Sequence, residues 1–149
     1  MQKRITALDK LLDEQGNLKH PGYSTELLLE YNRSDIKANK WRIKEWDYYL
    51  ISNKDYAIAL TIDDNSYMGL VSASFINLKD KFEKTVSKMF WFPNGKTNLP
   101  SSSKSGITQK TGKDYSCKFT VEDNKRILEC IIENFYNDKP YKVYIELTN

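Results

Sequence analysis

Residues 115–134 read YSCKFTVEDNKRILECIIEN, and this stretch decides the fold class. Over residues 115–121, aromatic and apolar side chains alternate with Ser, Lys and Thr. Such alternation is typical of a strand in an antiparallel sheet, with one face buried and the other in solvent. Asp123-Asn124 then separates this strand from a second apolar run, and both residue types tolerate the positive φ of a two-residue hairpin loop. The stretch therefore predicts an antiparallel hairpin.

The register of that hairpin predicts which residues face each other across it. A two-residue loop places Cys117 opposite Cys130 on the buried face. The neighbouring pairs also match in chemistry, which stabilises a sheet, and they are Lys118 with Glu129 and Phe119 with Leu128. We expect the two cysteines to be reduced thiols that pack as small apolar groups, with a redox-active pair as the alternative.

The same alternation recurs along most of the chain from Trp41 onward. Besides residues 115–121 and 126–134, strands are predicted over residues 41–51, 56–62, 67–78, 89–92 and 141–148. A turn at Asn53-Lys54 is expected to pair Tyr49 with Ile58. Several short strands at regular spacing are typical of a barrel or a sandwich. We therefore expect an all-β fold, mostly an antiparallel meander.

Two segments depart from this pattern. Residues 1–40 lack the alternation and are expected to form an irregular N-terminal arm, with residues 41–149 as the antiparallel β domain. Within the arm, Ser24 is a candidate N-cap for a short helix over residues 25–31. Residues 92–113 contain two prolines and three glycines, which predicts a long loop. Loops of this length in a compact domain are usually functional or disordered.

Composition places the chain among ordinary soluble domains. It has 149 residues and a net charge of +3, with 40% hydrophobic and 29% charged residues. Lysines are interleaved with acids and form no basic stripe, so no nucleic-acid partner is expected. No apolar run approaches the roughly 18 residues of a membrane-spanning helix, and no secretory signal is expected because the first residues contain no continuous apolar run. We therefore expect a cytoplasmic protein without a membrane span.

Glu45 and Asp47 are paired carboxylates in an aromatic setting. Strand alternation puts both on the face of Tyr49, unless a bulge near Glu45 exchanges the two faces. In a dry cavity the pKa of such carboxyls rises, and one could act as a general acid. The alternative is a structural salt bridge to Arg42, to Lys44 or to a neighbouring strand. Glu45 and Asp47 are thus the candidate catalytic residues, and whether the chain is an enzyme stays open.

Aromatic residues supply the candidate ligand contacts. They make up 13% of the chain, more than the alternating strands explain, and the unexplained ones include Trp41, Trp46, Tyr48 and Trp91. Trp91 belongs to an aromatic run before Pro93 that is either a core strand or the lip of an apolar pocket. Barrel mouths and their flanking loops commonly hold ligands. We therefore expect an apolar or amphipathic small molecule as the partner.

Other chemistries lack the residues that they need. His20 has no His or Cys at ligand spacing, so no metal site is predicted. Gly95-Lys96-Thr97 looks like the end of a phosphate-binding loop, but Phe90 stands where that motif has glycine and Pro100 prevents the helix that should follow. The adjacent pair Asp63-Asp64 is expected to serve a turn. No cofactor is predicted.

Residues 32–33, 41–49 and 95–101 read NR, WRIKEWDYY and GKTNLPS. With these segments the chain resembles the bacterial family described as domain of unknown function 2804, over essentially its whole length. The resemblance implies no activity, because none is established for that family. Its members are usually about twice this long, so the resemblance implies that the chain corresponds to their N-terminal half. A broader similarity to lipocalin-like proteins, which include carotenoid hydratases and tocopherol cyclases, implies a lipocalin-like barrel or half-barrel.

Three hypotheses of function follow. The first is a β-barrel-type module that binds an apolar or amphipathic small molecule between aromatic side chains. The second is half of a lipocalin-like enzyme that performs acid–base chemistry on a lipid or isoprenoid-like substrate, with Glu45 or Asp47 donating the proton. The third is a truncated structural fragment without activity of its own. A homodimer through an exposed sheet edge is a further expectation.

Overall fold

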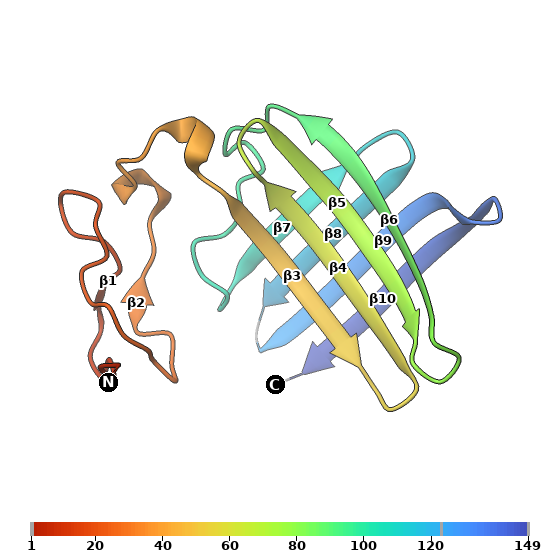
Figure 1. Ribbon diagram of the computed structural model, residues 1–149, viewed down its shortest axis with the longest axis horizontal. Coiled ribbons are helices and arrows are strands. Elements are labelled where there is room, and N and C mark those ends of the chain that lie inside the picture. The colour runs from red at the N-terminus through yellow and green to blue at the C-terminus, as the bar shows by residue number, and fades with distance from the viewer. Residues whose placement is uncertain (1, 123, 149) are drawn as a thin grey trace.

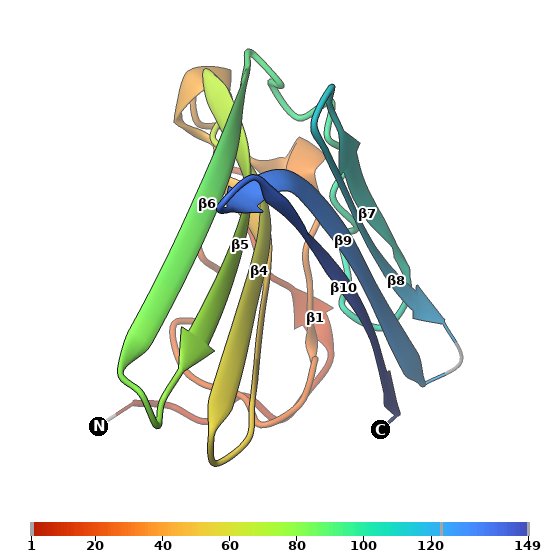
Figure 2. The same cartoon turned by 90° about the vertical axis from the view of Figure 1, so that its right-hand side faces the viewer.

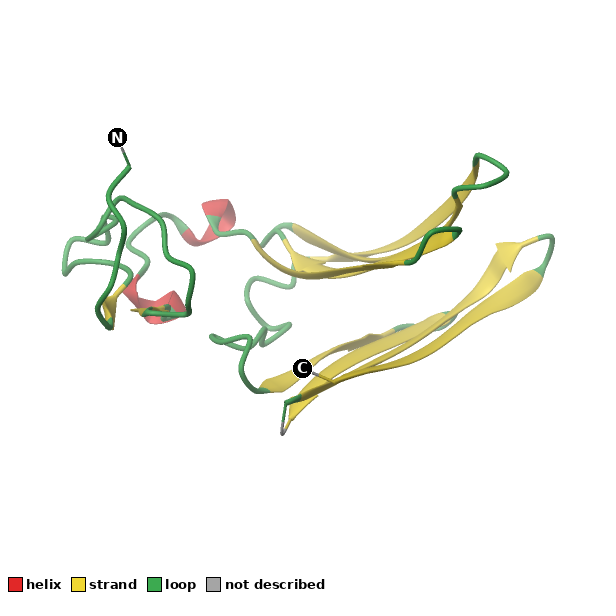
Figure 3. Cartoon of the chain, turned by 90° about the horizontal axis from the view of Figure 1, so that it is seen from below, coloured by secondary structure: helices red, strands yellow, loops and turns green. Residues whose placement is uncertain are grey.

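The computed structural model describes residues 2–122 and 124–148 and is built from two four-stranded antiparallel sheets packed face to face (Figures 1 and 3). The first sheet contains β3 (Glu45–Ser52), β4 (Tyr56–Asp64), β5 (Met68–Asn77) and β6 (Phe82–Trp91). The second contains β7 (Gly106–Thr111), β8 (Tyr115–Glu122), β9 (Lys125–Tyr136) and β10 (Lys139–Thr148). Each sheet is a meander of strands that follow one another in sequence. The all-β expectation is confirmed.

The sheets do not close into a barrel, and of the barrel and the sandwich that the strand spacing allowed, the structure has the sandwich. Among the described residues, β3 and β6 remain edges of the first sheet, and β7 and β10 remain edges of the second. The strands of the two sheets run across one another (Figure 1). The sheets come together where β9 bends toward β6, and they splay apart on the opposite side (Figure 2). Contact at that corner includes the rings of Phe82 and Tyr136, whose centroids are 5.8 Å apart.

The β8–β9 hairpin has the predicted register. Cys117 pairs with Cys130, Lys118 with Glu129 and Phe119 with Leu128. Asp123 of the predicted turn lies outside the described residues, and Asn124 has the expected positive φ of 63°. The expectation of reduced thiols is wrong, because Cys117 and Cys130 form a disulfide across the two strands.

The first hairpin is shifted by two residues from the prediction. Tyr49 pairs with Leu60 and not with Ile58. The reason lies in the turn, where the Asn53 side chain accepts hydrogen bonds from the backbone N–H groups of Asp55 and Tyr56, both at 2.8 Å. Asn53 therefore lies just before the loop and closes it with its side chain. The two loop residues are Lys54 and Asp55, one position later in the sequence than predicted. A shift of two residues keeps every side chain on its predicted face.

Two strands lie partly or wholly outside the predicted ones. β6 begins at Phe82 and not at residue 89, and β7 occupies part of the expected long loop, which shrinks to residues 92–105. Their inner faces carry long polar side chains, Lys84 and Lys88 on β6 and Lys110 on β7, so the sequence shows no clear apolar alternation. The amine of Lys110 lies 4.2 Å from the centre of the Phe90 ring. Because these lysines face inward, the alternation of apolar and polar residues does not reveal the two strands in the sequence.

The N-terminal arm is irregular. Its strands are the short parallel pair β1 (Asp9–Lys10) and β2 (Leu29–Glu30). The helix expected over residues 25–31 is not formed, because the Ser24 hydroxyl closes a local turn with the backbone N–H and carbonyl of Glu26. The helical content of the described residues consists of two 3₁₀ helices, η1 (Arg33–Asp35) and η2 (Lys40–Arg42), and no helix there is long and apolar enough to cross a membrane.

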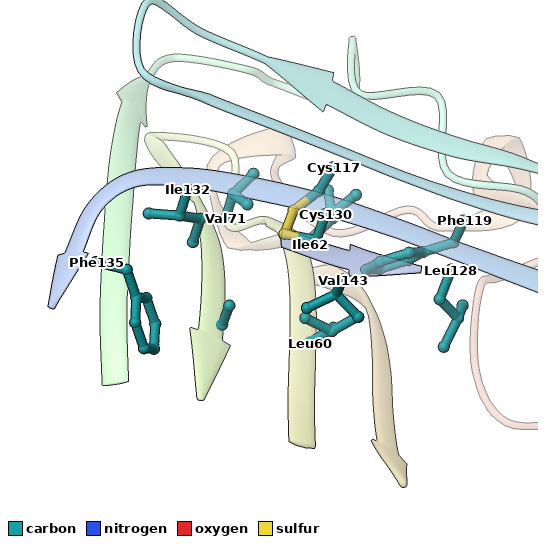
Figure 4. Close-up of a cluster of buried hydrophobic side chains, with 11 residues drawn as sticks. Leu60, Ile62, Val71, Cys117, Phe119, Leu128, Cys130, Ile132, Phe135 and Val143 are labelled. Atoms are coloured by element: carbon teal, nitrogen blue, oxygen red, sulfur yellow. A yellow bond between two sulfur atoms is a disulfide. The ribbon is translucent and has the colours of Figure 1, made fainter. Parts of the chain in front are cut away.

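Apolar side chains from both sheets fill the space between them (Figure 4). The fully buried members include Leu60, Ile62, Val71, Phe119, Leu128 and Ile132. Tyr49 packs edge-on against Phe119, with ring centroids 5.2 Å apart. The interior of the sandwich is therefore a packed core, and open clefts lie at its margins.

Candidate functional site

Glu45 begins β3 on the inner face of the first sheet, with its side chain only 14% exposed. Both of its carboxylate oxygens are engaged. The Tyr31 hydroxyl donates to Oε1 at 2.6 Å, and the Arg33 guanidinium forms a salt bridge with Oε2. The ion pair is thus made with the N-terminal arm and not with Arg42 or Lys44. Of the two orientations considered for this strand, the structure has the carboxylates on the inner face.

Asp64 ends β4 directly opposite Glu45 and is 1% exposed. Its Oδ1 accepts a hydrogen bond from the backbone N–H of Ser66 at 2.9 Å. Its Oδ2 accepts from the backbone N–H of Gly95 at 2.8 Å and from the Thr97 hydroxyl at 3.0 Å. This carboxylate therefore attaches the loop after β6 to the first sheet.

Gly95 connects that loop to the arm as well. Its φ of +84° lies in the left-handed region, and a Cβ atom at this position would lie 2.6 Å from Nε of Arg33. The backbone of Gly95 consequently lies against the guanidinium that pairs with Glu45. Residues 32–33, 41–49 and 95–101 thus meet in one polar cluster at the end of the first sheet.

Asp47 follows two residues after Glu45 on the same face. Its carboxylate accepts a hydrogen bond from the hydroxyl of Thr108, which is 1% exposed, and so links β3 to β7. Burial raises the pKa of the neighbouring Tyr49, and the negative charge of Asp47 raises it further. Asp47 is therefore a hydrogen-bonded carboxylate at the contact between the two sheets.

An open cleft of about 350 Å³ borders this cluster. Its lining combines carboxylates, a lysine and apolar side chains, namely Tyr31, Ile36, Lys44, Glu45, Trp46, Asp47, Leu99 and Pro100. A second open cleft of about 830 Å³ lies between the arm and residues 101–104 and shares Tyr31. A ligand in the first cleft would meet both apolar surface and charged groups.

The candidate aromatic residues are divided among three places. Trp46 lines the cleft, although its side chain is 63% exposed. Trp41 packs edge-on against Phe92 at 6.3 Å, and Trp91 lies 6.4 Å from the same ring. Tyr48 points to the outer face of the first sheet. The structure therefore brings Glu45, Asp47 and Trp46 together and leaves Trp41, Trp91 and Tyr48 outside the cleft.

Several members of the cluster were not singled out as site residues by sequence reasoning. Asp64 serves the turn as expected, through the backbone N–H of Ser66, and it also holds the 95–97 loop. Tyr31, Arg33 and Thr97 lie in or beside the segments that carry the family resemblance. Attention to those segments could therefore have identified these three residues from the sequence. Thr108 had no such signal. In the described part of the chain, no group of three His, Cys, Asp or Glu side chains is arranged to hold a metal ion.

The segments that meet in the cluster are the ones that carry the family resemblance. The family model described as domain of unknown function (DUF2804) matches residues 2–149. The chain belongs to this family. The DUF2804 match spans the arm and both sheets, so the arm that supplies Tyr31 and Arg33 is part of the family's domain. Neither the curated proteins nor the solved structures contain a match to the chain.

Proposed function

We propose that the chain binds an amphipathic small molecule in the cleft beside Glu45. The observation that supports this function is the lining of the cleft, where two carboxylates and Lys44 lie beside the apolar side chains of Trp46 and Leu99. Its volume of about 350 Å³ lies within the usual size range of small-molecule sites. The apolar part of the ligand packs against Trp46, Leu99 and Pro100, and its polar end lies near Lys44 and Asp47.

The acid–base hypothesis gains no support from this geometry. A general acid must carry a proton that it can pass to the ligand. Glu45 already accepts a hydrogen bond from Tyr31 on one oxygen and pairs with Arg33 through the other, so both oxygens are engaged within the protein and not with a ligand. We therefore propose binding and no reaction.

Three probes with the same chain and different head groups test the proposal. Octanol, octylamine and octanoate are titrated into isotopically labelled protein, and the backbone amide NMR shifts are followed. We expect shifts that saturate at residues 44–47 and 99–100 for at least one probe. Saturable shifts elsewhere, or none with any probe, would contradict the proposal.

A matched pair of variants locates the site. Trp46 and Leu50 both lie on the exposed side of β3, at 63% and 57% exposure, but Trp46 lines the cleft and Leu50 does not. Trp46→Ala should weaken probe binding by about tenfold, the usual effect of removing an aromatic anchor. Leu50→Ala should leave the affinity unchanged. Equal effects of the two substitutions would mean that the probe binds the outer face of the sheet.

A further inference from the structure

β10 forms an open edge of the second sheet. Its side away from β9 pairs with no other strand of the described residues, and in Figure 1 it follows the lower border of that sheet. The pairing with β9 is regular from Tyr141 to Thr148, and the irregularity is confined to the start of the strand at Lys139. A long regular edge presents unpaired backbone N–H and C=O groups to any other strand.

The other three edges carry a feature that blocks such pairing. Charged residues that point inward discourage a second chain from extending a sheet. β3 has Glu45 and Asp47 on its inner face, β6 has Lys84 and Lys88, and β7 has Lys110. The inner face of β10 carries Tyr141, Val143, Ile145 and Leu147, all of which pack in or against the core. Among the described strands, β10 is thus the edge without an inward-facing charge.

The sequence of β10 is complementary to itself. When two copies are placed antiparallel about a two-fold axis at Tyr144, Lys142 of each lies opposite Glu146 of the other. On the inner face, Val143 then lies opposite Ile145. Opposed charges and opposed β-branched residues both stabilise an antiparallel pair. One register therefore satisfies both faces.

Neighbouring registers lose this complementarity. The buried faces of the two copies lie on the same side of the joined sheet only if the register between the two β10 strands changes in steps of two residues. An axis at Val143 puts Lys142 opposite Tyr144, and an axis at Ile145 puts Tyr144 opposite Glu146. Neither alternative forms an ion pair. The charges consequently select the register centred on Tyr144.

The outer side chains are free to make these contacts. Tyr144 is 66% exposed, more than any other aromatic side chain of the described residues. Glu146 pairs with Lys125 at 2.7 Å, but both side chains are exposed, at 38% and 54%. Exposed ion pairs of this kind contribute little and rearrange easily. We propose that two copies of the chain join through β10, antiparallel about Tyr144, into one continuous sheet that spans both molecules.

Charge exchange on β10 tests the proposal, with the molar mass measured by sedimentation over a dilution series. The wild type should approach twice 17.4 kDa. Lys142→Glu and Glu146→Lys each place like charges opposite one another at two symmetry-related positions, so each should weaken the dimer by about tenfold. The double variant restores opposite charges and should recover the wild-type dissociation constant. Glu133→Lys, an exposed change on β9, should have no effect.

Each other result overturns the proposal. A wild type that stays monomeric at every concentration has no self-association through β10, even if it pairs with a strand of another protein. A dimer that is insensitive to both single variants uses another surface. A double variant that remains as weak as the single ones excludes the register centred on Tyr144. Circular dichroism spectra that match the wild type show that the variants are folded, since positions 142 and 146 face solvent.

Discussion

Glu45 and Asp64 lie directly opposite one another on β3 and β4, with both carboxylates on the inner side of the first sheet. Like charges in opposed positions destabilise a sheet. Each carboxylate here has its own donors, Tyr31 and Arg33 for Glu45, and backbone N–H groups with Thr97 for Asp64. Two separate segments of the chain therefore bind to this end of the sheet, because one supplies an ion pair to Glu45 and the other supplies hydrogen-bond donors to Asp64.

Asp64→Ala should lower the free energy of unfolding by about 3 kcal/mol or more, because it leaves two buried donors and one partly buried donor without an acceptor. Chemical denaturation measures this loss. Asp80→Ala is the matched control, since the Asp80 carboxylate accepts from the side chain of Asn77 at an exposed turn. It should change stability by less than about 0.5 kcal/mol. Equal losses for both variants would show that the loop does not depend on Asp64.

Gly95→Ala should lower the unfolding free energy by about 3 kcal/mol, through left-handed backbone strain and through collision with the Arg33 guanidinium. Gly16→Ala is the control for the contact with Arg33. Its φ of +82° is nearly the same, and its new methyl group would meet Cγ, Cβ and the backbone N of Lys37 but no member of the Arg33–Glu45 ion pair. That variant should also lose about 1 kcal/mol or more, but it should leave the Arg33 side chain in place. A shifted Arg33 Nε–H resonance in Gly95→Ala alone would report the displaced guanidinium, and its absence would contradict the contact.

Tyr141→Phe should raise the unfolding free energy by about 1 kcal/mol. The Tyr141 ring stacks on Phe135 with centroids 4.4 Å apart, and its hydroxyl oxygen is buried without a hydrogen-bond partner in the described part of the chain. Removing the hydroxyl therefore removes the free-energy cost of burying an unpaired polar group, and it breaks no hydrogen bond. Urea denaturation at neutral pH measures the change. A loss of stability in the variant would reveal a partner for this hydroxyl.

The same substitution should change the response to alkaline pH. Burial raises the pKa of Tyr141 to about 12, whereas an unfolded tyrosine ionises near 10. Between these values the folded state keeps the proton that the unfolded state has lost, so wild-type stability falls as the pH rises through this interval. Tyr141→Phe should fall less steeply. Tyr31, whose pKa burial and Glu45 also raise to about 12, is present in both proteins, so the difference isolates Tyr141. Identical slopes would contradict the shift.

Reduction of the Cys117–Cys130 disulfide should lower the unfolding free energy by about 3 kcal/mol, given their separation of 13 residues in sequence. Denatured protein that has not been reduced should show no titratable thiol. The double variant Cys117→Ala/Cys130→Ala should be insensitive to reductant. Two reactive thiols in protein prepared without reductant would restore the interpretation of two packed, reduced cysteines.

Sequence alternation predicted those strands whose inner face is apolar. The β8–β9 hairpin was predictable to the residue, because its turn and its cross-strand pairs agree. β7 was not predictable in this way, since Gly106, Thr108 and Lys110 occupy its inner face. The choice between a barrel and a sandwich was not predictable, because residues 92–105 bind to Asp64 and lead β7 to the other layer, and local sequence periodicity contains no information about such a tertiary hydrogen bond.

The candidate site was predicted in part. Alternation put Glu45 and Asp47 on the inner face, where they are found. Their partners Arg33 and Thr108 come from segments 12 and 61 residues away in sequence. Such pairings depend on how the layers pack, and strand periodicity contains no information about them. The family-like segments were the one feature of the sequence that marked several of these distant residues together.

The meander arrangement of each sheet has a consequence for assembly of the chain. All strand pairing of the sandwich lies either within residues 45–91 or within residues 106–148, so each layer can form from neighbours along the chain. The segment 92–105 is the covalent link between the layers. A cut in this link would yield two fragments, each with a complete sheet and half of the apolar core. The native state then depends on mutual recognition of two preformed layers, much as two subunits recognise one another.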